Sequence, residues 1–130
     1  MVHNNKIKRF LVCCSILFVI GCSKDGTVIF DTGAEITRPV SFATDITPIF
    51  TGSCGISGCH SSGGKSPDLT SANAFNSLTV GNFIDKANPE SSLLYLWMAG
   101  KKGTPMPVGG VNKDYNALVL AWIKQGAQNN

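Results

Sequence analysis

Two cysteines and a histidine lie close together in residues 54–60, which read Cys-Gly-Ile-Ser-Gly-Cys-His. A thiol can add to each vinyl group of a porphyrin, and an imidazole directly after the second cysteine is placed to ligate the iron. Four residues separate Cys54 from Cys59, whereas the usual motif has two. The pattern predicts covalent haem attachment through Cys54 and Cys59, with His60 as an axial ligand.

A haem iron that only carries electrons needs a second axial ligand, commonly a Met thioether or another His. After residue 21, His60 is the only histidine, and Met98 and Met106 are the only methionines. Met98 falls in an apolar helical run, where methionine usually serves packing. Met106 stands between two prolines in a Gly-rich loop, a rigid setting for a thioether. We therefore expect Met106 to be the second ligand, with Met98 as the alternative.

Two other uses of these residues stay open. An exported location is oxidising, so Cys54 and Cys59 could form a disulfide, although so short a loop gains little from closure. A zinc ion could instead take Cys54, Cys59 and His60 as ligands. Because residues 22–130 hold no further His, and no further Cys apart from Cys22, the fourth zinc ligand would have to be a carboxylate such as Asp68.

The first 21 residues have the composition of an export signal. Basic residues precede an apolar run at residues 11–20, which is too short to span a bilayer. The run ends Val19-Ile20-Gly21-Cys22, which resembles the lipobox of bacterial lipoproteins. That resemblance implies cleavage before Cys22, lipidation of Cys22 and, with Ser23 next, an outer-membrane location. An ordinary secretory signal is the alternative, but no small-x-small site follows the run.

Removal of residues 1–21 changes the charge balance. The loss of Lys6, Lys8 and Arg9 leaves eight basic residues against eight acidic ones, so the whole-chain charge of +3 belongs to the signal. Without an excess of basic residues, no nucleic-acid partner is expected. Residues 22–40 show no sustained periodicity and are interpreted as a tether between the membrane and the domain.

Four short helices joined by long loops are predicted after residue 40, and no strand pattern competes with them. Their apolar residues recur at three- and four-residue steps, between capping residues and glycines. The expected helices run from a cap at Thr44 or Asp45 to Gly52, from a cap at Thr70 or Ser71 to Gly81, over residues 91–99 behind Asn88-Pro89-Glu90, and from Asn112 to Gly126. Loops this long usually serve a function, and the apolar stripes alone make a thin core. A large, flat, apolar ligand would complete the interior.

The order of these motifs resembles that of small class I c-type cytochromes, most closely the planctomycete-type or Bacteroidetes-type cytochrome c-like domain. The matching pieces are His60, Ser66-Pro67-Asp68-Leu69, Pro89-Glu90-Ser91-Ser92-Leu93-Leu94-Tyr95, Met106-Pro107, Trp122-Ile123 and Gly126-Ala127. The resemblance covers residues 41–128. It implies an all-α fold of about four short helices with long loops around one haem, in which the first and last helices cross and Phe50 meets Trp122.

The same resemblance implies a set of haem contacts. One haem c is bound covalently through Cys54 and Cys59, with His60 and Met106 as the axial ligands of the iron. The carbonyl of Pro67 accepts the N–H of the proximal imidazole, which orients the ring.

These expectations combine into a lipid-anchored monohaem carrier that passes single electrons between a redox donor and a redox acceptor at the cell envelope. No enzyme is expected, because no pair of a nucleophile and a general base can be identified in the sequence. An iron with two axial ligands from the protein would also have no open position. The alternative is a haem-free surface lipoprotein, a binding or structural module with a Cys54–Cys59 disulfide.

Overall fold

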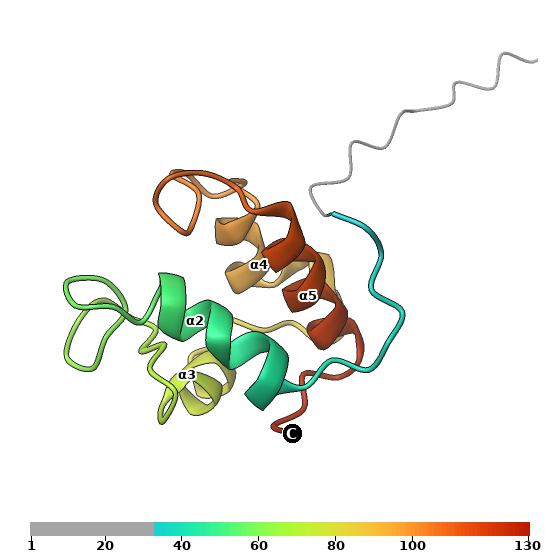
Figure 1. Ribbon diagram of the computed structural model, residues 1–130, viewed down its shortest axis with the longest axis horizontal. Helices are drawn as coiled ribbons and strands as arrows, with labels where there is room; N and C mark the ends of the chain where they lie inside the picture. Colours follow the sequence, from blue (N-terminus) through green and yellow to red (C-terminus); the bar gives the residue numbers. More distant parts are fainter. Residues whose placement is uncertain (1–32) are drawn as a thin grey trace, which may run out of the picture.

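The computed structural model describes residues 33–130, and in this range it is helical and contains no strand. The elements are η1 (Phe42–Ile46), α2 (Thr47–Ser53), α3 (Ala74–Val80), η2 (Pro89–Ser91), α4 (Leu93–Met98) and α5 (Lys113–Lys124). The predicted all-α class is confirmed for these residues, and each of the four expected helices is present (Figure 1). The predicted signal at 1–21, the lipidation of Cys22 and the first part of the tether lie outside the described residues.

The first helix begins earlier than the sequence predicted. Ser41 is its N-cap, and the Ser41 hydroxyl accepts a hydrogen bond from the Thr44 N–H at 3.3 Å. Asp45 does not cap the helix, but its carboxylate accepts the Ser41 N–H at 2.8 Å. The Ser41 and Asp45 side chains therefore each accept one backbone N–H at the start of the helix. The first turn, η1, is a wide π turn, and α2 follows it directly and continues through Gly52 to Ser53.

The start of α3 also differs from the prediction. Asn73, rather than Thr70 or Ser71, precedes the helix. The Thr70 hydroxyl is not available as a cap, because it donates to the Asp68 carboxylate at 2.6 Å. The backbone carbonyl of Thr70 still accepts from Ala74 N–H at 2.9 Å, which begins the helical hydrogen bonding.

The predicted helix over residues 91–99 is divided in two. Pro89–Ser91 forms the short 3-10 turn η2, and α4 begins only at Leu93. Between them Ser92 is extended, with ψ 130°, and its hydroxyl accepts the Asp85 N–H at 2.9 Å. Ser92 is buried, so this side-chain bond to a neighbouring segment interrupts the helix.

The last helix, α5, contributes many of the buried residues of the core. Its predicted cap is confirmed, since the Asn112 side chain accepts the N–H groups of Asp114 and Tyr115 at 3.1 and 3.0 Å. Trp122 on this helix is fully buried, and its ring lies 5.1 Å from that of Phe42. Phe42 reaches Trp122 because the early helix start lays η1 across α5, and Phe50 is buried in the same core cluster.

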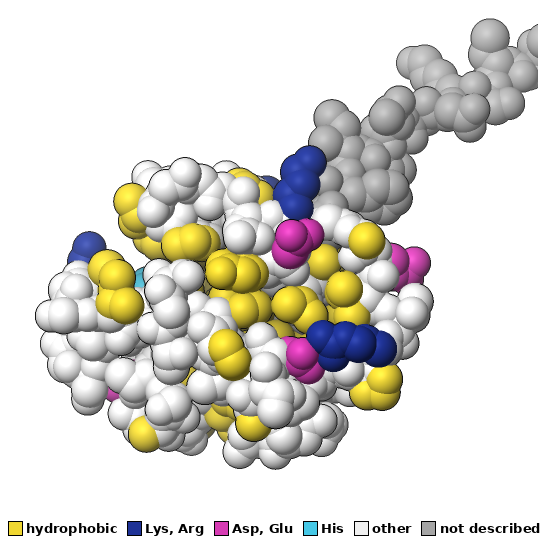
Figure 2. All heavy atoms as spheres, in the orientation of Figure 1, with side chains coloured by type: hydrophobic (Ala, Val, Ile, Leu, Met, Phe, Trp, Pro, Cys, Tyr) yellow, Lys and Arg dark blue, Asp and Glu magenta, His cyan; other side chains and the backbone are white. Residues whose placement is uncertain are grey.

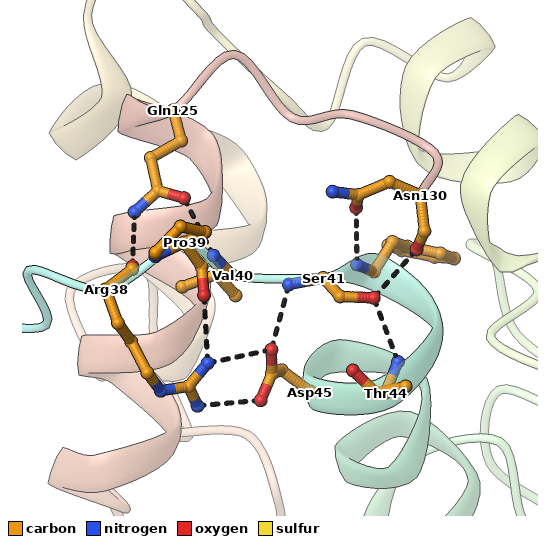
Figure 3. Close-up of polar contacts among 9 residues, drawn as sticks. Arg38, Pro39, Val40, Ser41, Thr44, Asp45, Gln125 and Asn130 are labelled. Atoms are coloured by element: carbon orange, nitrogen blue, oxygen red, sulfur yellow. Dashed lines mark hydrogen bonds and ion pairs between the residues drawn. The ribbon is translucent and has the colours of Figure 1, made fainter.

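Part of the segment interpreted as a tether is fastened to α5. The Gly33 N–H donates to the Lys113 carbonyl at 2.8 Å, and Val40 is buried. The Gln125 side chain accepts the Val40 N–H at 2.8 Å and donates to the Arg38 carbonyl at 2.9 Å (Figure 3). The packed unit thus extends ahead of residue 41.

The surface in the view of Figure 2 has apolar side chains at its centre, with charged groups of both signs scattered around them. No large patch of one charge appears on this face. Among residues 33–130, no helix combines the length and the apolar character needed to cross a membrane.

Candidate functional site

A cavity of about 330 Å³ brings together all five residues that the sequence assigned to cofactor binding. Cys54, Cys59, His60 and Pro67 line it from the loop after α2, and Met106 lines it from the loop before α5. These two loops lie at the same end of the molecule (Figure 1). Much of the remaining wall is apolar and includes Phe50, Leu69, Phe83, Leu94, Trp97 and Met98.

The four-residue spacer between the cysteines folds into a compact loop. The His60 N–H donates to the Cys54 carbonyl at 3.0 Å, and the Cys59 N–H donates to the Ile56 carbonyl at 3.0 Å. Gly58 has φ +80°, a conformation that favours glycine. A Cβ on Gly55 would lie 2.6 Å from the Leu69 carbonyl oxygen, so only glycine fits this approach. The two extra residues of the spacer are therefore accommodated within this loop, and the backbone of Cys54 stays hydrogen-bonded to that of His60.

Cys54 and Cys59 are free thiols and are not joined to each other. Cys54 is buried and Cys59 half-buried. Burial raises the pKa of the Cys54 thiol to about 11, and the charge of a Cys59 thiolate adds to the effect. Cys54 is therefore a neutral thiol at pH 7. A neutral thiol is a poor nucleophile and a poor metal ligand, so Cys54 is unsuited to act as a thiolate nucleophile.

The zinc alternative has no ligand set in the part of the chain that the structure describes, where no three His, Cys, Asp or Glu side chains are grouped to hold a metal ion. Asp68, its suggested fourth ligand, is engaged elsewhere. Its carboxylate accepts hydrogen bonds from the hydroxyl and the N–H of Thr70, at 2.6 and 3.0 Å, and from the Asn73 amide at 2.9 Å.

The imidazole of His60 is oriented by backbone carbonyls. Its Nδ1 lies 3.1 Å from the carbonyl oxygen of Lys65 and 3.1 Å from that of Pro67. Because both partners only accept, Nδ1 must carry a proton, and in the neutral imidazole the lone pair is then on Nε2. A histidine held in this tautomer can ligate a metal through Nε2, and the bond to the carbonyl fixes the ring orientation.

The Pro67 carbonyl is itself held in place by the turn that follows it. The Asp68 N–H donates to the Ser77 hydroxyl on α3 at 2.9 Å, and the Leu69 N–H donates to the His60 carbonyl at 2.8 Å. Hydrogen bonds from Thr70 and then Asn73 lower the pKa of the Asp68 carboxyl, so the carboxylate that organises the turn stays ionised. This supporting role of Asp68 was missed in the sequence, although the Asp-x-Thr spacing is a known turn signal.

Both methionines line the cavity, so proximity alone does not choose between them. Met98 is 2% exposed and belongs to the core of α4. Met106 is half-buried, and its N–H donates to the Trp97 carbonyl at 3.1 Å. A backbone hydrogen bond to α4 therefore positions the Met106 loop, in addition to the prolines around it. The choice of Met106 stays a prediction.

The chemical content of the cavity fits a haem. It offers two thiols on one loop, an imidazole with an available lone pair, a thioether and a wall rich in aromatic and aliphatic groups. Its volume falls within the range of small-molecule sites, about 300–1,000 Å³. Lys65 was not predicted as a site residue, yet it is the only charged residue among those that line the cavity.

Comparison of the chain with protein-family models, with curated proteins and with solved structures finds no match. The assignment of a function to this cavity therefore rests on the residues and contacts described above.

Proposed function

We propose that this protein is a monohaem c-type cytochrome that carries single electrons, with a class I cytochrome c fold around one covalently bound haem. Cys54 and Cys59 would hold the porphyrin through thioether bonds, and His60 and Met106 would ligate the iron. When bound, haem supplies a one-electron couple between ferric and ferrous iron.

The observation that carries the proposal is the setting of His60. Its Nδ1 donates to the Pro67 carbonyl at 3.1 Å, which leaves Nε2 as a ligand atom, and the ring lines the same cavity as both thiols and the Met106 side chain. A histidine that served only packing would need neither an oriented imidazole nor a place in the same cavity as two thiols and a thioether. Cys54 is also buried in the apolar wall of the cavity, a setting that suits an uncharged thioether sulfur.

The residues around the cavity have separate tasks in this proposal. Pro67 orients the imidazole of His60, and the Trp97 carbonyl holds the Met106 loop through its backbone. The apolar wall would keep water away from a bound iron, and this exclusion and the thioether ligand would together influence its potential. With His60 and Met106 as its two ligands, the iron would have no open position, so the protein would serve as a carrier rather than as an enzyme.

The location and partners belong to the same proposal. A lipid on Cys22 would anchor the domain to the outer membrane, on its periplasmic or surface side. Electrons would enter and leave at the cavity mouth, where Ile56 and Val108 are exposed beside the cysteine loop and the Met106 loop. The donor and the acceptor would be other redox proteins of the envelope, and no nucleic acid is involved.

The test is production of the full chain together with cytochrome maturation machinery, followed by haem staining and a pyridine haemochrome spectrum. We expect covalent haem in the native chain, and none in the double variant Cys54→Ser with Cys59→Ser. Ser57→Ala, an exposed change in the same loop, is the matched control and should keep the stain.

A native chain that is colourless, folded and indistinguishable from the double serine variant would overturn the proposal. If such a chain also had a mass two hydrogens lower than its reduced form, the haem-free lipoprotein with a Cys54–Cys59 disulfide would replace it.

A further inference from the structure

We infer that Ser77 is a positioning residue for the proximal histidine. Its hydroxyl accepts a hydrogen bond from the peptide group that itself accepts the His60 imidazole N–H, and this support strengthens the bond to the imidazole. The inference rests on the proposed function, since its consequence is a lower midpoint potential of the iron. It gives a task to a side chain on α3 that is not among the residues lining the cavity.

A single peptide group connects Ser77 to His60. The carbonyl of Pro67 and the N–H of Asp68 both belong to that group. The carbonyl accepts from His60 Nδ1 at 3.1 Å, and the N–H donates to the Ser77 hydroxyl at 2.9 Å. Hydrogen bonds in such a chain polarise one another, so donation by the N–H makes the carbonyl oxygen a stronger acceptor. Ser77 therefore acts on the imidazole through this peptide group.

The Pro67 carbonyl is the more shielded of the two acceptors of the imidazole. Nδ1 also lies 3.1 Å from the Lys65 carbonyl, but Lys65 is exposed, whereas Pro67 is buried. Because a hydrogen bond is electrostatically stronger where water is excluded, the bond to Pro67 contributes more to the electron density of the imidazole. A change in the strength of this acceptor should therefore reach the iron.

Helix α3 fixes the position of the Ser77 hydroxyl. Ala74 and Leu78 on the same helix are fully buried, and the Ser77 N–H donates to the Asn73 carbonyl at 2.8 Å. The oxygen that supports the peptide group is therefore held by a helix packed into the core, and not by the loop that carries His60.

The experiment measures the midpoint potential of the holoprotein by spectroelectrochemical titration. An imidazole that donates a stronger hydrogen bond is a more basic ligand and stabilises the ferric state. Ser77→Ala removes the support and should raise the potential by about 20 mV, which is a roughly twofold shift of the ferric–ferrous equilibrium at about 59 mV per tenfold for one electron. Solvent exchange of the His60 Nδ1 proton, followed by NMR in the ferrous state, should become faster.

Two variants on the same helix make the comparison specific. Ser77→Thr keeps the hydroxyl and should retain the native potential and exchange rate. Thr79→Val removes a hydroxyl that donates to the Phe75 carbonyl at 2.8 Å, within α3, and should change neither. The sulfur-to-iron absorption band should remain in every variant, which shows that a change of potential does not come from loss of the thioether ligand.

The outcomes separate the inference from the proposed function. If haem is attached but Ser77→Ala leaves the potential and the exchange rate unchanged, only the inference is overturned. An equal rise of the potential in Thr79→Val would also overturn it, because the effect would then come from a general loosening of α3. A native chain that attaches no haem overturns the proposed function, and the inference with it.

Discussion

At the scale of single residues, the site depends on hydrogen bonds that prepare side chains for ligation. His60 donates from Nδ1 to two backbone carbonyls, so in the neutral imidazole the lone pair is on Nε2. The carbonyl of Pro67 is in turn fixed by the turn around Asp68. Met106 has a comparable support, because its N–H is bound to the Trp97 carbonyl.

The choice between the two methionines is testable at this scale. In the oxidised holoprotein, Met106→Ala should abolish the weak sulfur-to-iron absorption band and lower the midpoint potential, because thioether ligation raises it. Met98→Leu is the control, since it keeps the buried volume of α4 and should retain the band. Loss of the band in Met98→Leu and its persistence in Met106→Ala would assign the ligand to Met98 instead.

At the scale of elements, α5 provides the surface on which η1, η2 and α4 pack. It contributes the fully buried Val119, Trp122 and Ile123, and η1 lies across it through the contact of Phe42 with Trp122. The Met106 loop leads directly into α5, which begins at Lys113. The start of α5 therefore sets the end of that loop. Asn112 fixes this start by accepting two backbone N–H groups.

Removal of this cap should therefore destabilise the fold. Asn112→Ala leaves the Asp114 and Tyr115 N–H groups without their acceptor, and we expect the free energy of unfolding to fall by about 1 kcal/mol. Urea unfolding followed by circular dichroism measures this difference. Asn112→Ser keeps a capping oxygen and should recover most of the loss, and equal stability of the alanine variant would show that the cap contributes nothing.

At the scale of the whole molecule, segments distant in the sequence close around the first helix turn. Asn130 accepts hydrogen bonds from the N–H groups of Phe42 and Ala43, at 2.9 Å each, and from the Ser41 hydroxyl at 2.9 Å. Arg38 binds both carboxylate oxygens of Asp45, at 2.7 and 3.0 Å (Figure 3). These contacts join the arm before η1 to the segment after α5.

The Arg38–Asp45 pair should make the stability of the folded protein depend on pH. The hydrogen bond from Arg38, followed by that from the Ser41 N–H, lowers the pKa of Asp45 in the folded protein. The contribution of Asp45 to stability is then complete above the pKa of an unfolded Asp, about 4, and is lost as the pH falls through the lower folded value.

Thermal unfolding from pH 7 to pH 2.5 tests this dependence. The native chain should exceed Asp45→Asn in stability by about 1 kcal/mol at pH 7, with the difference shrinking below about pH 4. Glu90→Gln removes the exposed pair with Lys124 and serves as the control, with a change of roughly 0.5 kcal/mol or less. A difference for Asp45→Asn that does not depend on pH would contradict the role of its carboxylate charge.

The helical class and the approximate place of each helix could be predicted from the sequence, because they depend on short-range signals. The Asn112 cap and the glycines after α4 and α5, at Gly100 and Gly126, act within a few residues of the helix ends. Caps failed as signals where the side chain bonded another partner, as Thr70 bonds Asp68. Ser92 bonds to the segment at Asp85 and divides the third helix, and no local pattern records that contact.

The residue types of the candidate site, Cys54, Cys59, His60 and Met106, were likewise determined by the sequence alone. Only the tertiary structure decided that the loop after α2 and the loop before α5 line one cavity, and that Lys65 is the one charged residue among its described lining residues. It also decided that the ring of Phe42 lies 5.1 Å from that of Trp122. The physical reason is the same in each case: local hydrogen bonding and periodicity define helices, whereas cavities and ring contacts arise from packing between segments that are far apart in the chain.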